Sequence, residues 1–103
     1  MRIRFLRAGL PLPEVNADIY DSAGKWIAMV DLSWPGHRVA FDYEGDHHRT
    51  DRKQWSKDLI RARRIGEAGI TYVRAGAADL SNTSHLIAGL KRHLAAGSTG
   101  ITA

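Results

Sequence analysis

The sequence predicts an α/β domain in which helices flank one mixed β-sheet. Two observations lead to this fold class. Between residues 14 and 44, apolar residues alternate with polar ones in three short segments, as in half-buried strands. After residue 50, two segments with helical spacing of apolar residues enclose one more strand-like segment, and a strand reached through a helix commonly pairs in parallel. The expected order is helix, three strands of antiparallel type, helix, strand, helix.

The first half of the chain accounts for a short helix and three strands. Residues 1–10 have the apolar pattern of a helix that stops near Gly9, and strands are expected over 14–20, 25–33 and 38–44. On the third strand, alternation puts three aromatic or apolar residues on one face and two acidic residues on the other. The first set is Val39, Phe41 and Tyr43; the second face carries Ala40, Asp42 and Glu44.

Two turns connect these strands. Asp21-Ser22-Ala23-Gly24 has the chemistry of a hairpin turn, because Asp accepts local backbone hydrogen bonds and Gly tolerates positive φ. Trp34-Pro35-Gly36-His37 predicts a type II turn, with Pro at the second position and Gly at the third.

The second half predicts a helix, a strand and a last helix. Thr50 or Asp51 can cap the first of these helices, which should end near Ala68, and a strand is expected over 70–74. Ser81 or Thr83 can cap the last helix. The predicted buried stripes are Trp55, Leu59, Ala62 and Ile65 on the first helix, and Leu86, Ile87, Leu90 and Leu94 on the second. We expect Trp26, Trp34 and Trp55 in the core.

Composition limits the class of protein. The chain has 103 residues, which suits one domain over residues 1–96, with 97–103 expected to be a disordered tail. It has no cysteine, so disulfides and thiolate metal sites are excluded, and it lacks both a secretory signal pattern and an apolar run long enough to span a membrane. These features indicate a cytoplasmic protein. The net charge of +4 indicates an anionic partner without naming one.

Acidic residues gather on two neighbouring strands. Asp31 lies on the second strand, and Asp42 and Glu44 lie two residues apart on one face of the third. Hard carboxylate oxygens suit Mg²⁺ or Mn²⁺, which can activate a water and neutralise a phosphate. The sequence therefore predicts a metal-dependent phosphodiesterase site; the simpler interpretation is an exposed acidic edge that serves solubility.

Cationic and histidine residues follow these strands directly. His48 has an ordinary pKa near neutrality and suits a general acid or base, although a polar turn would use it equally well. From residue 49 to 64 there are seven cations and two acidic residues, which leaves +5. This helix is either a solvated basic face or a surface that contacts the phosphate backbone. The residues we expect to contact nucleic acid are Arg49, Lys53, Gln54 and Arg61.

The motifs resemble a known group of nucleases. The segments V-D-L-S-W-P, R-V-A-F-D-Y-E-G-D-H-H-R, Q-W-x-x-D, G-x-x-Y-V-R and A-A-D-L, spread over residues 10–94, resemble a small bacterial endonuclease-like domain of unknown function. That family is related to the very-short-patch mismatch-repair endonucleases within the PD-(D/E)xK superfamily. The resemblance implies a restriction-endonuclease-like αβββαβ core with a C-terminal helix. Such domains often end a longer chain, behind a domain resembling an abortive-infection antitoxin.

The resemblance also implies roles for individual residues. Asp31 matches the metal-binding aspartate and Asp42 the acidic residue that opens the (D/E)xK motif, while Glu44 stands where many of these nucleases have lysine. The family more often has Glu and then Asp at the last two positions. The implied catalytic residues are Asp31, Asp42, Glu44 and His48, the first three also binding Mg²⁺ or Mn²⁺.

Three functions follow from these observations. The first is a DNA endonuclease acting in repair or defence, as a homodimer or with a partner domain that supplies DNA recognition. The second, favoured by the missing lysine, is an inactive nucleic-acid-binding module of a toxin–antitoxin or phage-defence system. The third is a small scaffold or dimerisation domain that binds neither DNA nor metal.

Overall fold

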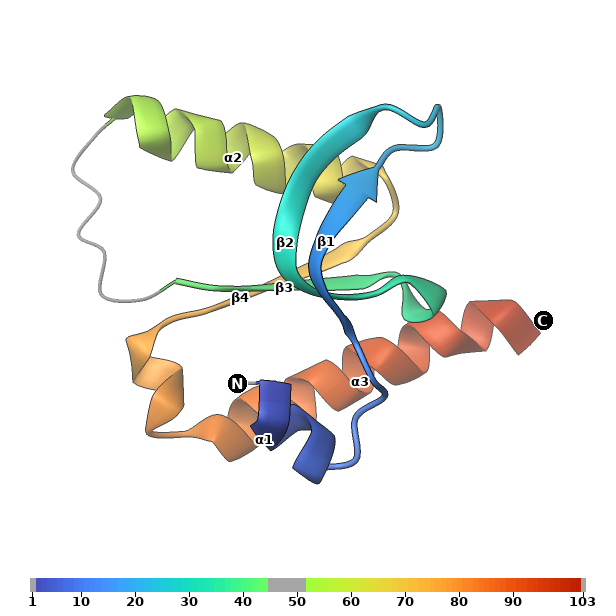
Figure 1. Ribbon diagram of the computed structural model, residues 1–103, viewed down its shortest axis with the longest axis vertical. Helices are drawn as coiled ribbons and strands as arrows, with labels where there is room; N and C mark the ends of the chain where they lie inside the picture. The colour runs from blue at the N-terminus through green and yellow to red at the C-terminus, as the bar shows by residue number, and fades with distance from the viewer. Residues whose placement is uncertain (1, 45–51, 103) are drawn as a thin grey trace.

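The computed structural model describes residues 2–44 and 52–102. The elements follow the expected order, with two short 3-10 helices added (Figure 1). They are α1 (Arg2–Arg7), β1 (Glu14–Tyr20), β2 (Trp26–Trp34), η1 (Pro35–His37), β3 (Val39–Tyr43), α2 (Arg52–Glu67), β4 (Thr71–Ala75), η2 (Ala77–Leu80) and α3 (Thr83–Thr102).

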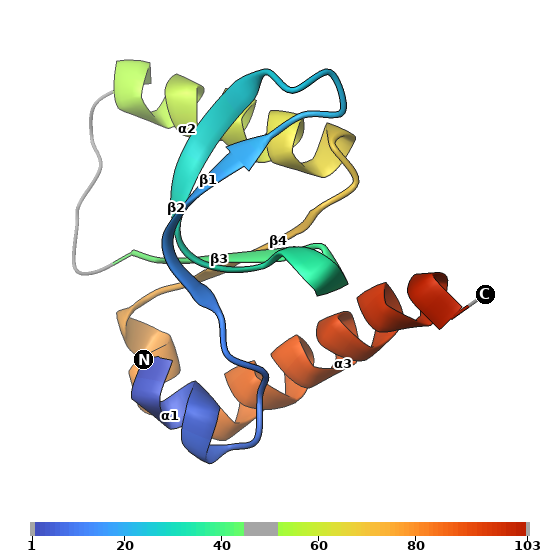
Figure 2. The same ribbon diagram turned by 45° about the vertical axis from the view of Figure 1, so that its right-hand side comes forward.

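The four strands form one mixed sheet in the order β1-β2-β3-β4. β1 with β2 and β2 with β3 are antiparallel, whereas β3 and β4 are parallel and joined through α2. The predicted α/β class, mixed sheet and C-terminal helix are therefore confirmed. Both views show α2 on one side of the sheet and α1 with α3 on the other (Figures 1 and 2).

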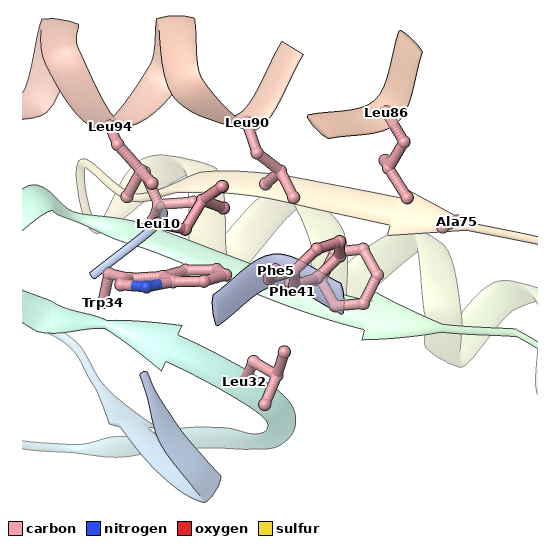
Figure 3. Close-up of a cluster of buried hydrophobic side chains, with 10 residues drawn as sticks. Phe5, Leu10, Leu32, Trp34, Phe41, Ala75, Leu86, Leu90 and Leu94 are labelled. Atoms are coloured by element: carbon pink, nitrogen blue, oxygen red, sulfur yellow. The ribbon is translucent and has the colours of Figure 1, made fainter. Parts of the chain in front are cut away.

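The larger core lies between the sheet, α1 and α3. The ring of Phe5, fully buried, meets Phe41 edge-on with ring centroids 5.2 Å apart, and the Trp34 ring lies 6.3 Å away. The Trp34 indole N–H donates to the Pro11 carbonyl at 2.8 Å, so its one polar atom is satisfied. Figure 3 shows the α3 stripe projecting onto these rings. Its buried members are the predicted Leu86, Leu90 and Leu94, with Ile87 partly buried.

The smaller core lies under α2 and corrects part of the predicted stripe. Ile65 is fully buried against the β1–β2 hairpin, but Trp55 and Leu59 are 59% and 46% exposed. Figure 1 shows the first turns of α2 extending beyond the curved hairpin. The helical spacing of apolar residues is thus present along α2, but these residues are buried only in the later turns, which pack against the sheet.

Trp26 is a second correction. It is 52% exposed rather than buried, and its indole N–H donates to the Asp18 carboxylate at 3.0 Å across the hairpin. Of the three tryptophans predicted in the core, only Trp34 is there. β2 is one residue longer at its C-terminus than predicted, and this places Trp34 in the sheet.

The Pro-Gly turn also differs from the prediction. Pro35–His37 forms a 3-10 helix, in which the Arg38 N–H donates to the Pro35 carbonyl at 3.2 Å. The left-handed residue is Arg38, with φ of 56°, instead of Gly36. A type II turn would need positive φ at Gly36. Proline suits both the second position of a type II turn and the first position of a helix. The Trp-Pro-Gly-His sequence therefore does not distinguish the turn from the 3-10 helix.

The last helix is longer than predicted. α3 continues past Gly97 to Thr102, where a disordered tail was expected. A Cβ atom at Gly97 would lie 1.7 Å from the His37 carbonyl oxygen, so glycine permits close contact between α3 and η1. The His37 ring nitrogen Nδ1 also lies 3.2 Å from the Leu94 carbonyl oxygen. Neither α3 nor any other helix in the described part of the chain has the length and apolar character needed to cross a membrane.

Candidate active site

The β2–β3 ladder opens where the two strands carry their aspartates. Its paired residues run from Trp34–Val39 to Leu32–Phe41 and stop there. In this register the next opposed residues are Asp31 and Asp42.

The two carboxylates replace the missing ladder hydrogen bonds. Asp42 Oδ1 accepts the Asp31 N–H at 2.8 Å, and Asp31 Oδ2 accepts the Tyr43 N–H at 2.8 Å. Each aspartate therefore binds the backbone of the opposite strand. This reciprocal arrangement holds both side chains in the opening and satisfies the backbone N–H groups of Asp31 and Tyr43, which lie beyond the last ladder pair.

Asp42 is the most buried acidic residue among those described, at 8% exposure. Its second oxygen accepts from Arg61 Nη2 at 2.7 Å and from the Tyr72 hydroxyl. The Arg61 guanidinium also donates to the Met29 carbonyl, which ties α2 to β2. A buried carboxylate needs such partners, because removing its hydration is costly. Asp42 thus has a structural role in joining β3, α2 and β4.

Tyr72 on β4 stays protonated in this setting. Burial raises the pKa of its hydroxyl above the ordinary value, and the hydrogen bond to Asp42 and that carboxylate's charge raise it further. The Arg61 charge acts in the opposite direction but does not offset them. The Tyr72 hydroxyl is therefore a donor to Asp42 and not a base.

Glu44 is held by a second arginine. It follows β3, and its carboxylate forms an ion pair with Arg74 of β4. Arg74 Nη2 also lies 3.7 Å from Asp58 Oδ2, and its guanidinium carbon lies 5.9 Å from the centre of the Tyr72 ring. The Arg74 guanidinium thus lies between two carboxylates and connects the end of β3, through Glu44, with Asp58 of α2.

All these side chains line one polar hollow of about 180 Å³. A water molecule occupies roughly 30 Å³ in the liquid, so the hollow can hold an ion with several waters but not a large substrate. Its polar lining consists of Asp31, Asp42, Tyr43, Glu44, Asp58, Arg61, Tyr72 and Arg74, with Met29 at one side.

The structure brings together four of the predicted site residues: Asp31, Asp42, Glu44 and Arg61. Arg61 was expected on the nucleic-acid-binding face, and instead its guanidinium holds Asp42. Lys53 and Gln54 are both in the first turn of α2, and Lys53 does not line the hollow. His48 and Arg49 lie outside the described residues.

Sequence reasoning assigned no role to Asp58, Tyr72 or Arg74. All three are fixed positions of the motifs Q-W-x-x-D and G-x-x-Y-V-R. Spacing carried a further signal. Asp58 lies three residues before Arg61 on one helix face, and Tyr72 and Arg74 lie two apart on one strand face.

The donor set can be compared with what Mg²⁺ or Mn²⁺ requires. Mg²⁺ is commonly bound through one or two carboxylates and keeps several waters, so Asp31 and Asp42 across the opening fit it chemically. Within residues 2–44 and 52–102, no three His, Cys, Asp or Glu side chains form a cluster able to hold a metal. Arg74 engages Glu44, so the expected three-carboxylate ligand set is not preformed.

Comparison with known proteins gives relatives without a described function. The chain is 32% identical over 94 residues to two uncharacterized proteins of Mycobacterium tuberculosis, Rv2248 and MT2308, from two strains. The match covers 90% of this chain and 34% of each relative, so the chain spans about a third of the length of the curated relatives it matches. No family model matches the chain. No solved structure matches it either.

Proposed function

We propose that this domain is a metal-dependent DNA endonuclease of the PD-(D/E)xK type with a restriction-endonuclease-like core. The observation that carries the proposal is the meeting of Asp31 and Asp42 across the open end of the β2–β3 ladder. Hydrolysis of a phosphodiester needs an activated water and stabilisation of the charge on phosphate. Acidic side chains serve the first requirement by binding a metal, and cationic side chains serve the second. The polar hollow contains both kinds.

The side chains divide the task as follows. Asp31 and Asp42 would hold Mg²⁺ or Mn²⁺, which when bound supplies charge neutralisation and an activated water. Arg61 and Arg74 bring positive charge from α2 and β4, in a site that lacks the motif lysine. Glu44, which pairs with Arg74, would accept a proton from that water. The remaining cations of α2 would contact the phosphate backbone beyond the hollow.

A second candidate is a binding module without catalysis. It is favoured by the three donors on Asp42, which come from Asp31, Arg61 and Tyr72 and leave this carboxylate little capacity for a metal. In this role Asp42 braces the fold and the basic helix contacts DNA. The biological setting would be a toxin–antitoxin or phage-defence system. In such a system the module would act with a partner domain, and the relatives are long enough to contain one.

The test is nicking of supercoiled plasmid with Mg²⁺ and with Mn²⁺, comparing the native chain with Asp31→Asn. Asp31 is chosen because it is exposed and Asn can still accept the Tyr43 N–H, so folding is preserved. The matched control is Asp18→Asn, another exposed strand aspartate that accepts one hydrogen bond, outside the hollow. Loss of a metal ligand should lower cutting on the order of 100-fold or more, and the control should cut normally.

Each other outcome points elsewhere. Equal cutting by Asp31→Asn would refute the site. Absence of metal-dependent cutting, with DNA affinity that falls steeply as salt rises, would establish the binding module. Absence of both cutting and binding would leave a scaffold or dimerisation domain.

A further inference from the structure

A second hollow opens beside the candidate active site and differs from it in chemistry. It measures about 420 Å³. Its floor is formed by Leu32 and Phe41, both buried members of the larger core, and its walls include Val15 of β1 and Leu80 of η2. Both wall residues are about half exposed. The hollow is thus an apolar depression that solvent can enter.

The two hollows are joined through shared residues. Asp31 and Tyr43 line both of them. A hydrogen bond of 2.8 Å from the Tyr43 N–H to Asp31 Oδ2 connects these two shared residues. A ligand whose charged end reaches the carboxylates can therefore place an attached apolar group in the second hollow.

Size distinguishes what the two hollows can take. Pockets for small organic ligands usually measure about 300–1,000 Å³, a range that includes the apolar hollow and excludes the polar one. Two further polar residues, Arg2 and Asn16, also line the apolar hollow. Asn16 has a left-handed backbone with φ of 50°, which asparagine tolerates, and it lies on β1 between the Val15–Leu32 and Ala17–Val30 pairs.

The geometry points to an unpaired nucleobase as the occupant. A base has apolar faces and polar edges, and it is joined through its sugar to the phosphate that the carboxylate site would act on. A base stacked in a duplex cannot enter such a depression without leaving the stack. We propose, on the basis of the proposed function, that the apolar hollow receives one unpaired base, and that this domain selects single-stranded or unpaired DNA over intact duplex.

The experiment compares a short fluorescein-labelled single strand of mixed sequence with the same strand in a full duplex. Binding is followed by fluorescence anisotropy with Ca²⁺ in place of Mg²⁺, so that affinity is measured separately from cutting. Base stacking on protein side chains is worth enough that the single strand should bind about tenfold more tightly.

Two variants make the hollow polar without changing its charge. Val15→Gln and Leu80→Gln replace half-exposed wall residues on different elements, so misfolding of one leaves the other as a test. Each should bring the two affinities close to equality. The matched control Leu12→Gln alters an exposed apolar residue that does not line the hollow, and it should keep the preference.

Equal affinity of the native chain for single strand and duplex would overturn the inference. So would a preference that persists in both folded variants. The endonuclease proposal is judged separately. A duplex cut by the native chain but not by Asp31→Asn would keep the enzyme and, with equal affinities, reject the base site. A single-strand preference without any cutting would keep the base site in a binding module.

Discussion

At the scale of single residues, Asp31 and Asp42 differ more than their shared residue type indicates. Asp42 is buried and accepts hydrogen bonds from Asp31, Arg61 and Tyr72, whereas Asp31 is exposed and accepts one from Tyr43. Removing Asp42 would leave part-buried donors unpaired, which costs far more than losing an exposed contact. Loss of activity in an Asp42 variant would therefore mix chemistry with folding, while an Asp31 variant separates them.

Tyr72 gives the residue-scale prediction. Its pKa is raised in the folded state, mainly by burial, so the hydroxyl keeps its proton at a pH where the unfolded chain loses it. The stabilisation is complete below about pH 10, the ordinary tyrosine value, and falls as pH rises above it. We expect the native chain to lose free energy of unfolding more steeply than Tyr72→Phe between about pH 10 and pH 12.

Urea unfolding of both proteins across this range measures the difference. Every other residue is the same in the two proteins. The contribution of Tyr72 is therefore the difference between their free energies of unfolding at each pH. Parallel curves would show that the Tyr72 hydroxyl is not buried against Asp42.

At the scale of elements, the contact between η1 and α3 depends on the absence of a side chain at Gly97. A methyl group there would overlap the His37 backbone carbonyl, and backbone cannot move as a flexible side chain can. We expect Gly97→Ala to destabilise the protein by about 1–3 kcal/mol, despite the higher helix propensity of alanine.

Gly89→Ala in the same helix is the matched control. A Cβ atom at Gly89 would lie 3.7 Å from Arg92 Nη2, which is an ordinary van der Waals distance. This variant should be more stable by about 0.5–1 kcal/mol, because alanine favours the helix. Thermal unfolding of both proteins tests the pair, and a stabilising effect of Gly97→Ala would mean that α3 does not lie against η1.

At the scale of the whole molecule, α1 completes the larger core although it is only six residues long. So short a helix is marginal alone, and its stability must come from packing. Phe5 supplies that packing, because its ring is fully buried against Phe41 and Trp34.

Phe5→Ala should lower the free energy of unfolding by about 3–5 kcal/mol, as truncation of buried aromatic residues does. Ile3→Ala, at an exposed position of the same helix, should change it by no more than about 0.5 kcal/mol. Denaturant unfolding measures both. Equal small effects would show that α1 is not an integral part of the domain.

Periodicity in the sequence by itself determined the order of helices and strands, the bounds of β1, and the α3 stripe. It also placed Val39 and Phe41 on one face of β3 and Asp42 on the other, which the two core clusters and the polar hollow confirm. These features follow from local geometry, since a period of two or 3.6 residues assigns faces without knowledge of the neighbours. The sequence also placed Asp31 and Asp42 on neighbouring strands, although not directly opposite one another.

Only the tertiary structure decided which apolar faces are covered and which charges meet. Trp55 and Leu59 have the spacing of a buried stripe, yet no sheet lies beneath the early turns of α2. Arg61 has the sequence context of a nucleic-acid contact, yet in the fold its guanidinium pairs with Asp42 of β3 and donates to the Met29 carbonyl of β2. Burial and ion pairing depend on where distant segments lie, and no periodicity within one segment contains that information.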